Sequence, residues 1–356
     1  MLLTIGGFLC GFAAGAAARY GRICSMSAIE DALVARDFRA AKAWGVALAV
    51  AILVTYAAGR AIPIDFAASV YAVGPLDLVG TLVGGCIFGF GMALAGTCSF
   101  GLLVRVGGGD LRAAITACIV GISAFAFTAG VLAPVRTALS GVAAFDLSAH
   151  GGTLLPGLIA SLSGLDAGTA AFASVFGIAA LLVLGAILDR RMRTRPRLLA
   201  AAVVMGIAVG GGWGVTAVAV DRLDSARLES LSFVAPAGRL LLQLMSDTLR
   251  DVGFGVSSVV GVVCGAAAAA TAKDDIRWEA FDDVREMRRH LTGAMLMGLG
   301  GVLARGCTIG QGMSAASALT VSAPLVIVGI VIGARIGLSL LLEGHAMWRT
   351  GTGERR

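Results

Sequence analysis

Long apolar runs separated by short polar stretches make up most of this chain. Each run carries almost no charge and is about 17–25 residues long, enough for an α-helix to cross a hydrocarbon layer about 30 Å thick. A helix satisfies its backbone polar groups internally, as a membrane requires. The pattern therefore predicts an all-α polytopic membrane protein with about nine transmembrane helices. Their expected ranges are 3–20, 42–59, 79–95, 111–133, 168–189, 198–219, 252–272, 288–304 and 319–343.

The composition agrees with this class. Of the 356 residues, 58% are hydrophobic and 14% are charged, whereas a soluble domain carries about 25% charged residues. The net charge of +6 comes from basic residues in the loops, for example RRMRTRPR at residues 190–197. Cytoplasmic loops of membrane proteins carry such an excess. We therefore expect the lipid bilayer as a partner, and no nucleic acid.

The basic loops also predict the orientation of the chain. One orientation, with the N-terminus outside and the C-terminus inside, places every basic loop in the cytoplasm. No basic residue precedes Arg19, so the first run is expected to remain as a helix rather than act as a signal peptide. The outer loop 221–251 is long enough for an amphipathic helix. The stretches expected inside are 31–42, 103–112, 190–197, 273–290 and the tail after Glu343, and those expected outside are 60–78, 134–167 and 220–251.

Two distant segments repeat each other around a single cysteine. They are GFGMALAGTCSFG at 89–101 and GLGGVLARGCTIG at 298–310, and a weaker third copy is GAAARYGRICSMS at 15–27. The third and eighth spans lead into the first two copies and run in opposite directions. An odd fifth span between two four-span halves produces this inversion, which is a common plan in transporters. We therefore expect two inverted pseudo-repeats, over about 1–134 and about 198–345, with a connecting helix at about 168–189.

The three cysteine-bearing segments are expected to depart from helical geometry. Glycine weakens helices and lets backbones approach closely, and the cysteines stand in stretches such as GTCSFG and RGCTIGQG. Non-helical backbone at membrane depth is tolerated where it is buried in protein or lines a pore. We therefore expect re-entrant loops that each present a thiol. The span 198–219 has no cysteine that corresponds to Cys24.

Cys24, Cys98 and Cys307 are the candidate residues of a substrate pathway. A neutral thiol is a weak hydrogen-bond donor and a polarisable acceptor, so it suits the soft sulfur of an anion better than a strongly hydrated oxyanion. Several weak sites in succession admit a substrate and still release it. Further contacts are expected from Arg22 and Arg305 to the charge of the anion, and from Thr97, Ser99, Thr308 and Gln311 to its oxygen atoms.

Structural roles are the alternative for several residues. Arg22 and Arg305 could instead anchor the chain at the headgroups, and Gln311 could satisfy a backbone group of its own loop. The run at 273–289 is expected to be a solvated cytoplasmic helix. With no CxxC pair and three scattered histidines, the sequence predicts no disulfide framework, metal centre or cofactor. The remaining cysteines, expected to be small buried hydrophobes, are Cys10, Cys86, Cys118 and Cys264.

The glycine-framed cysteines resemble those of the YeeE/YedE sulfur-transport proteins, which are bacterial inner-membrane importers of thiosulfate. The resemblance covers nearly the whole chain and depends most on the segments around Cys98 and Cys307, and less on RICSMS around Cys24. It implies an hourglass-like inverted-repeat fold, in which the three cysteines relay thiosulfate through contacts between S–H and sulfur. In a bacterial inner membrane, the N-terminus that we expect outside the cytoplasm would lie in the periplasm. The resemblance also implies cooperation with a small cytoplasmic sulfur-carrier protein of the TusA type.

The leading hypothesis is a permease rather than an enzyme, and the sequence leaves alternatives open. A membrane thiol/disulfide oxidoreductase would exchange disulfides among the three cysteines, but such exchange usually needs a resolving cysteine nearby, and no adjacent pair exists. Transport of another sulfur compound, including a persulfide, is a second alternative, and a non-transporting scaffold is a third. No Walker motif is present, so ATP is not expected as the energy source within this polypeptide. The order of the thiols and the oligomeric state do not follow from the sequence.

Overall fold

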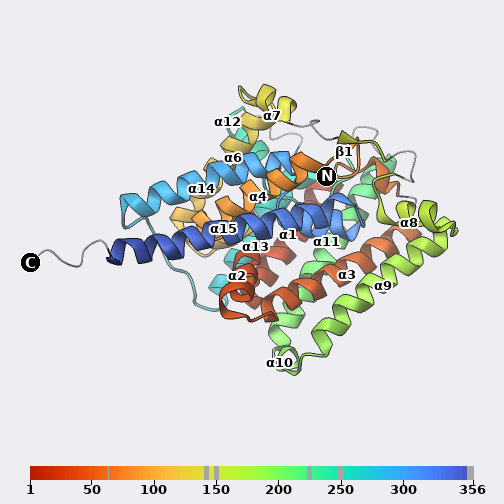
Figure 1. Ribbon diagram of the computed structural model, residues 1–356, viewed down its shortest axis with the longest axis horizontal. Coiled ribbons are helices and arrows are strands. Elements are labelled where there is room, and N and C mark those ends of the chain that lie inside the picture. The colour runs from red at the N-terminus through yellow and green to blue at the C-terminus, as the bar shows by residue number, and fades with distance from the viewer. Residues whose placement is uncertain (63, 140–143, 148–151, 223–226, 247–251, 351–356) are drawn as a thin grey trace, which may run out of the picture.

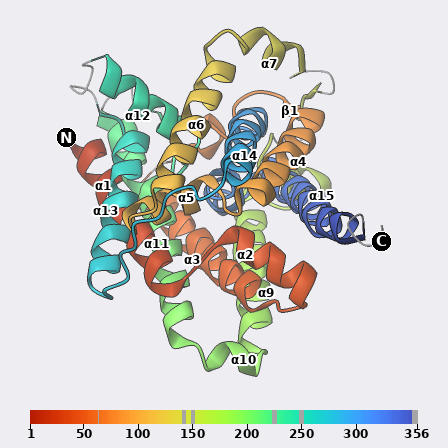
Figure 2. The same ribbon diagram turned by 90° about the vertical axis from the view of Figure 1, so that its left-hand side faces the viewer.

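The computed structural model describes the chain apart from residues 63, 140–143, 148–151, 223–226, 247–251 and 351–356. Long helices lie side by side in it (Figures 1 and 2), and two short strands, β1 (Leu76–Asp77) and β2 (Ala144–Phe145), pair antiparallel with Leu76 opposite Phe145. The α-helices are α1 (Leu2–Gly21), α2 (Ser25–Glu30), α3 (Arg39–Ala61), α4 (Leu78–Ala95), α5 (Ser99–Gly107), α6 (Leu111–Thr128), α7 (Ala133–Leu139), α8 (Leu155–Ser163), α9 (Ala167–Ile187), α10 (Arg190–Arg193), α11 (Pro196–Arg222), α12 (Ala235–Met245), α13 (Phe254–Thr271), α14 (Val284–Leu303) and α15 (Ser322–Thr350). Single helical turns occur at η1 (Asp31–Ala35), η2 (Phe66–Ala68) and η5 (Gly310–Ala315).

The all-α polytopic class is confirmed. Among the described residues, 8 helices are long and apolar enough to cross a membrane, and each of them overlaps one of the nine predicted spans over most of its length. The remaining prediction, 288–304, lies within α14 (Val284–Leu303) except for its last residue. This helix begins with charged residues, VREMRRH, before its glycine-rich apolar part. It nevertheless packs along α4 and α6, as Figure 1 shows for α4.

The helices contact one another in a pattern with internal symmetry. Helix α1 packs on α13 as α11 packs on α3, and α4 packs on α15 as α14 packs on α6. Two further pairs, α1 with α11 and α4 with α14, join the halves, while α9 lies against α3. Exchanging α1 with α11, α3 with α13, α4 with α14 and α6 with α15 maps the contacts among these eight helices onto one another, and the α3–α9 contact lies outside this symmetry. Inverted repeats would produce such a set, although the division into repeats at 1–134 and 198–345 itself stays a prediction.

Glycines bring the helix backbones into direct contact. On α4, a Cβ atom at Gly89 would overlap the carbonyl oxygen of Ile330, and on α15 a Cβ atom at Gly333 would overlap that of Cys86. Small residues at membrane helix interfaces allow this close approach, because van der Waals packing must replace the hydrophobic drive that lipid does not supply. The same contact joins α1 to α13 through Gly7, Gly11 and Gly15.

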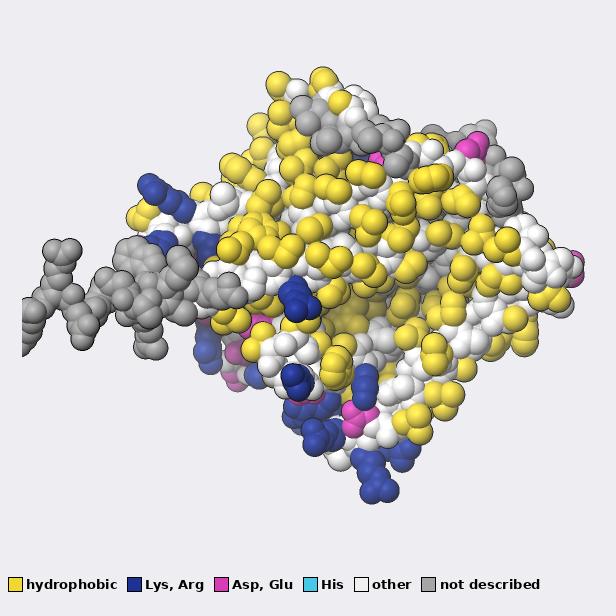
Figure 3. All heavy atoms as spheres, viewed as in Figure 1, with side chains coloured by type: hydrophobic (Ala, Val, Ile, Leu, Met, Phe, Trp, Pro, Cys, Tyr) yellow, Lys and Arg dark blue, Asp and Glu magenta, His cyan; other side chains and the backbone are white. Residues whose placement is uncertain are grey.

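The loops gather at two opposite ends in the groups that their charge predicted. At one end, Lys42 pairs with Asp189 at 2.7 Å and Arg19 pairs with Asp275 at 3.1 Å. At the other end, the amide of Val70 donates to the Leu228 carbonyl oxygen at 3.3 Å. Figure 3 shows Lys and Arg side chains along the lower and left edges of a broad hydrophobic face.

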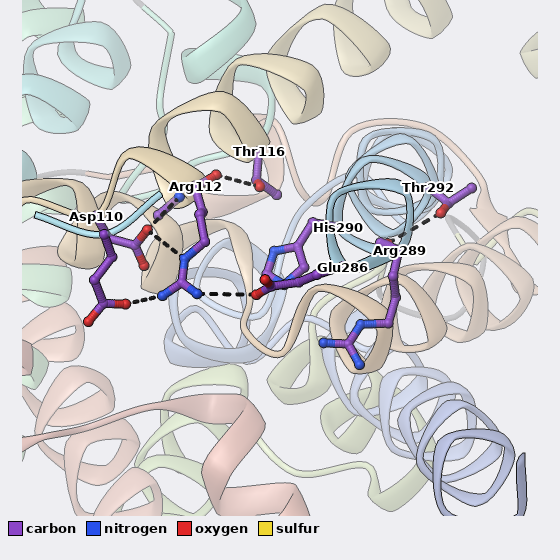
Figure 4. A network of polar contacts seen from close by, with 9 residues as sticks. Asp110, Arg112, Thr116, Glu286, Arg289, His290 and Thr292 are labelled. Atoms are coloured by element: carbon purple, nitrogen blue, oxygen red, sulfur yellow. Dashed lines mark hydrogen bonds and ion pairs between the residues drawn. The ribbon is translucent and has the colours of Figure 1, made fainter. Parts of the chain in front are cut away.

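A network of ion pairs and hydrogen bonds connects the loop 272–283 to the start of α6 at the basic end. The amide of Leu111 donates to the Glu279 carbonyl oxygen at 2.9 Å, and the Arg112 guanidinium contacts the carboxylates of Asp110, Glu279 and Glu286 (Figure 4). The prediction of a continuous helix at 273–289 is therefore wrong for its first part. Asp275 and Glu279 pair with Arg19 and Arg112 instead, and the helix begins only at Val284.

Two smaller expectations are also corrected. Cys118 and Cys264 are exposed on the outer surfaces of α6 and α13 rather than buried, and Cys10 and Cys86 are partly buried. The outer stretch 134–167 contains α8, which was not predicted, whereas the helix expected within 221–251 is present as α12. Residues 223–226 and 247–251 of the predicted outer stretch 220–251 lie outside the described residues.

Candidate functional site

A left-handed residue stands two positions before each of the three candidate cysteines. Arg22 has φ 53°, Gly96 has φ 69° and Arg305 has φ 54°. Such a residue ends a helix and redirects the chain. Glycine adopts this conformation without strain, but a residue with a Cβ atom costs about 1–2 kcal/mol there. The three segments thus share one backbone turn, and two of them hold an arginine at a strained position.

After this turn, Cys98 and Cys307 make the same contact. The amide of Gly101 donates to Cys98 Sγ at 3.4 Å, and the amide of Gly310 donates to Cys307 Sγ at 3.3 Å. Both cysteines are buried, with 1% and 0% of their surface exposed. The amide occupies a lone pair of each sulfur, so each thiol hydrogen is free to donate elsewhere. The repeated glycine has a separate reason: a Cβ atom at Gly101 would meet Thr97 Oγ1, and one at Gly310 would meet Ser232 Oγ.

The cysteine segments converge through hydroxyl groups. Cys24 Sγ lies 3.9 Å from Thr97 Oγ1, and Ser25 Oγ lies 3.5 Å from Thr308 Oγ1. The Cys98 thiol lies near Cys24 and near the hydroxyl groups of Ser25 and Thr308. Three segments that are far apart in the sequence therefore meet at one buried point.

Each cysteine is followed directly by a hydroxyl residue. These are Ser25, Ser99 and Thr308, all of them buried. Ser99 Oγ has no hydrogen-bond partner in the part of the chain that the structure describes. A buried polar group without a partner is rare in proteins and is available to a ligand. Sequence reasoning found Ser99 and Thr308 but missed Ser25, although the shared position after cysteine was a usable signal.

A cavity of about 860 Å³ opens at the end opposite the basic loops, next to the segment that precedes Cys307. Its inner wall includes Arg305 and Gly306, which directly precede Cys307. Arg305 Nη1 donates to the Val73 carbonyl oxygen at 2.8 Å, and its other N–H groups have no partner within the described ranges, so they are available to an anion. Tyr71 lies in the same wall, near Cys307 and the hydroxyls of Ser232 and Ser314. Burial raises the pKa of Tyr71, so its phenol remains a neutral hydrogen-bond donor.

Two buried side chains hold the Cys307 loop in place. Gln311 Nε2 donates to the Ala304 carbonyl oxygen at 3.0 Å, and Gln311 Oε1 faces the hydroxyl of Ser322 at 3.4 Å. Trp213 Nε1 donates to the Ser314 carbonyl oxygen at 3.3 Å. Gln311 thus bonds its own loop, and its contact with substrate stays a prediction. Trp213 belongs to the α11 segment without a cysteine, where its indole fills the space behind the loop.

At the basic end, a cavity of about 380 Å³ lies next to the turn that precedes Cys24. Arg19 is paired there with Asp275, whereas Arg22 and Arg105 form no ion pair among the described residues. Basic residues therefore border the cysteine segments at both ends. Within the described ranges, no group of histidine, cysteine and carboxylate side chains could hold a metal ion.

A family model described as sulphur transport matches residues 20–336. The chain belongs to the sulphur-transport family. Two similar proteins are named thiosulfate transporter TsuA. The one from Escherichia coli is 25% identical over 354 residues, covering 93% of this chain and 92% of the relative. The one from Spirochaeta thermophila is 26% identical over 337 residues, covering 92% and 96%. Both relatives align with this chain along nearly their whole length, so the similarity is not limited to one motif.

Within this sulphur-transport protein, several site residues escaped sequence analysis. Tyr71, Trp213 and Ser232 reach the Cys307 loop from segments without a cysteine, so no local pattern marked them. Among the described residues, four arginines line the outer cavity, and of these Arg305 stands at the position that is repeated before a cysteine. The others are Arg136, Arg227 and Arg239.

Proposed function

We propose that this protein is a permease of the bacterial inner membrane that imports thiosulfate, with a periplasmic N-terminus and a cytoplasmic C-terminus. The supporting observation is the convergence of the Cys24, Cys98 and Cys307 segments between a cavity at each end of the molecule. The names of the two relatives support thiosulfate as the substrate. The basic loops at one end support the orientation.

The proposed order of contacts along the path is Cys307, then Cys98, then Cys24. Cys307 follows Arg305 and Gly306 in the wall of the outer cavity, whereas Cys24 follows Arg22 at the basic end. Cys98 lies between them, since it neighbours Cys24 directly and reaches the Cys307 segment through Thr308. This order makes Cys307 the first thiol that a periplasmic anion meets.

Each proposed step exchanges one set of weak contacts for the next. A thiol S–H donates to the terminal sulfur of thiosulfate, while neighbouring hydroxyls donate to its oxygen atoms. Each weak hydrogen bond contributes about 0.5–1 kcal/mol, so no single site holds the anion firmly. Conduction requires this balance between admission and release. On the cytoplasmic side, we propose that a small sulfur-carrier protein of the TusA type receives the product.

Transport into proteoliposomes tests this function. Purified protein reconstituted in lipid vesicles is expected to accumulate radiolabelled thiosulfate, with unlabelled thiosulfate competing more strongly than sulfate, because sulfate has no terminal sulfur for the thiols. Equal competition by both anions would argue against a thiol pathway. Mixed disulfides among the three cysteines under oxidising conditions, without uptake, would favour the oxidoreductase alternative.

Arg305→Gly separates the charge of Arg305 from its backbone turn. Glycine adopts the left-handed turn freely, as Gly96 does in this chain, so stability is expected to stay equal or rise by about 1 kcal/mol. Loss of the guanidinium is expected to raise the KM for thiosulfate about tenfold or more, since a hydrogen bond to a charged group contributes about 1.5–3 kcal/mol. Uptake kinetics and thermal unfolding of the same preparation measure both effects. An unchanged KM would identify Arg305 as an interfacial anchor instead.

A further inference from the structure

Glu229 is an acidic residue in the wall of the outer cavity, where the proposed function requires an anion to enter. It lies in the segment between α11 and α12, next to the N-terminus of α13. Gly255, in the first turn of α13, lies next to its carboxylate. The Glu229 side chain is half-buried and lies between the N-terminus of α13 and the outer cavity.

Cationic groups reach Glu229 from different elements. Arg227 comes from its own segment and Arg239 from α12, and both attract the carboxylate without forming a salt bridge within the described ranges. The phenol of Tyr71 faces it from the segment before β1. The other charged groups of the cavity wall are Asp65, Arg136, Asp221 and Arg305.

A charged Glu229 competes with an entering anion in two ways. It neutralises part of the positive field of Arg227 and Arg239, and it repels the anion directly. Burial raises the pKa of Glu229 above its ordinary value, although the two arginines and the Gly255 amide oppose this shift. Its neutral form is therefore populated closer to neutral pH than that of a free glutamate side chain.

We propose that Glu229 is a proton-operated switch of the outer cavity, which binds thiosulfate tightly when this carboxyl group is protonated and weakly when it is ionised. The inference deepens the proposed function and depends on it, because the cavity must be the entrance for the substrate. By linkage, binding of the dianion takes up a proton at Glu229 from the external solution, and release of the anion returns it. No covalent bond changes in this step.

Binding of thiosulfate to the purified full-length protein between about pH 5.5 and 7.5 tests the switch. Thiosulfate remains a dianion over this range, so a change in affinity reports on the protein. For the wild type, Kd is expected to rise about tenfold from the lowest to the highest pH. For Glu229→Gln, Kd is expected to stay low and nearly constant. Titration in buffers with different heats of ionisation is expected to show proton uptake in the wild type and none in Glu229→Gln.

The controls separate Glu229 from the other acids of the cavity. Glutamine has the same shape as glutamate and keeps an oxygen next to Gly255, so Glu229→Gln keeps this packing against α13. Asp65→Asn and Asp221→Asn are expected to retain the pH dependence of the wild type, and Glu229→Asp is expected to retain pH dependence with a shifted midpoint. A wild-type pH dependence in Glu229→Gln would overturn the switch alone. Absence of thiosulfate binding at every pH would overturn the proposed function and the switch with it.

Discussion

Cys98→Ala is expected to reduce thiosulfate uptake by roughly 5- to 150-fold. Cys98 is buried at the point where the segments meet, with Ser25 and Thr308 next to its thiol. A methyl group cannot donate to the anion, and an unpaired polar group in such a buried position costs about 1–3 kcal/mol. Cys307→Ala is expected to act similarly at the outer end of the path. Initial rates of uptake in proteoliposomes, normalised to the amount of folded protein, measure both effects.

Two cysteines elsewhere in the chain supply a matched control. Cys118 and Cys264 are exposed on α6 and α13, away from the meeting point, so Cys118→Ala and Cys264→Ala are expected to leave uptake unchanged. Cys98→Ser is informative as well, because serine keeps a donor but replaces soft sulfur by oxygen. We expect an intermediate rate from it. Near-normal uptake by both Cys98→Ala and Cys307→Ala would reject the relay.

The positions of the membrane helices could be predicted from the sequence because lipid imposes a simple requirement. An apolar run of sufficient length must become a helix, and the prediction of 79–95, for example, agrees closely with α4 at Leu78–Ala95. The charged loops were harder. Residues 273–283 were expected to be helical, but their acidic side chains and backbone bind the turn before α6 instead. Such a choice depends on which partner lies opposite, and hydropathy carries no information about that.

Some residues of the candidate site could likewise be predicted from the sequence, and others could not. The cysteines were found because the same turn recurs, so glycines and cysteines repeat at fixed spacing around Cys98 and Cys307. Tyr71 and Glu229 come from outer loops that have no repeat, and only the folded chain brings them to the cavity next to the Cys307 loop. Gln311 shows the limit of a motif: its position was predicted, but its amide bonds the backbone of its own loop.

Gly89→Leu is expected to lose about 3 kcal/mol or more of folding stability, the largest effect on the fold that we predict. A Cβ atom at Gly89 would meet the Ile330 carbonyl oxygen on α15. This obstacle is backbone, which cannot change rotamer, so the two helices must separate. Gly333→Leu is expected to act alike, because a Cβ atom there would meet the Cys86 carbonyl oxygen from the opposite side of the same interface. Size-exclusion profiles and thermal unfolding in detergent measure the loss.

Gly177→Leu on α9 isolates helix packing from the general cost or benefit of a leucine in a membrane helix. A Cβ atom at Gly177 has no atom within 4 Å, so this substitution is expected to leave stability unchanged or to increase it. Equal stability of Gly89→Leu and Gly177→Leu would contradict this prediction, because it would mean that α4 and α15 do not make close backbone contact at Gly89. Because α4 leads directly into the turn at Gly96 and on to Cys98, separation of these helices is also expected to displace the thiol. Any Gly89→Leu protein that folds should therefore transport poorly, whereas folded Gly177→Leu protein should transport normally.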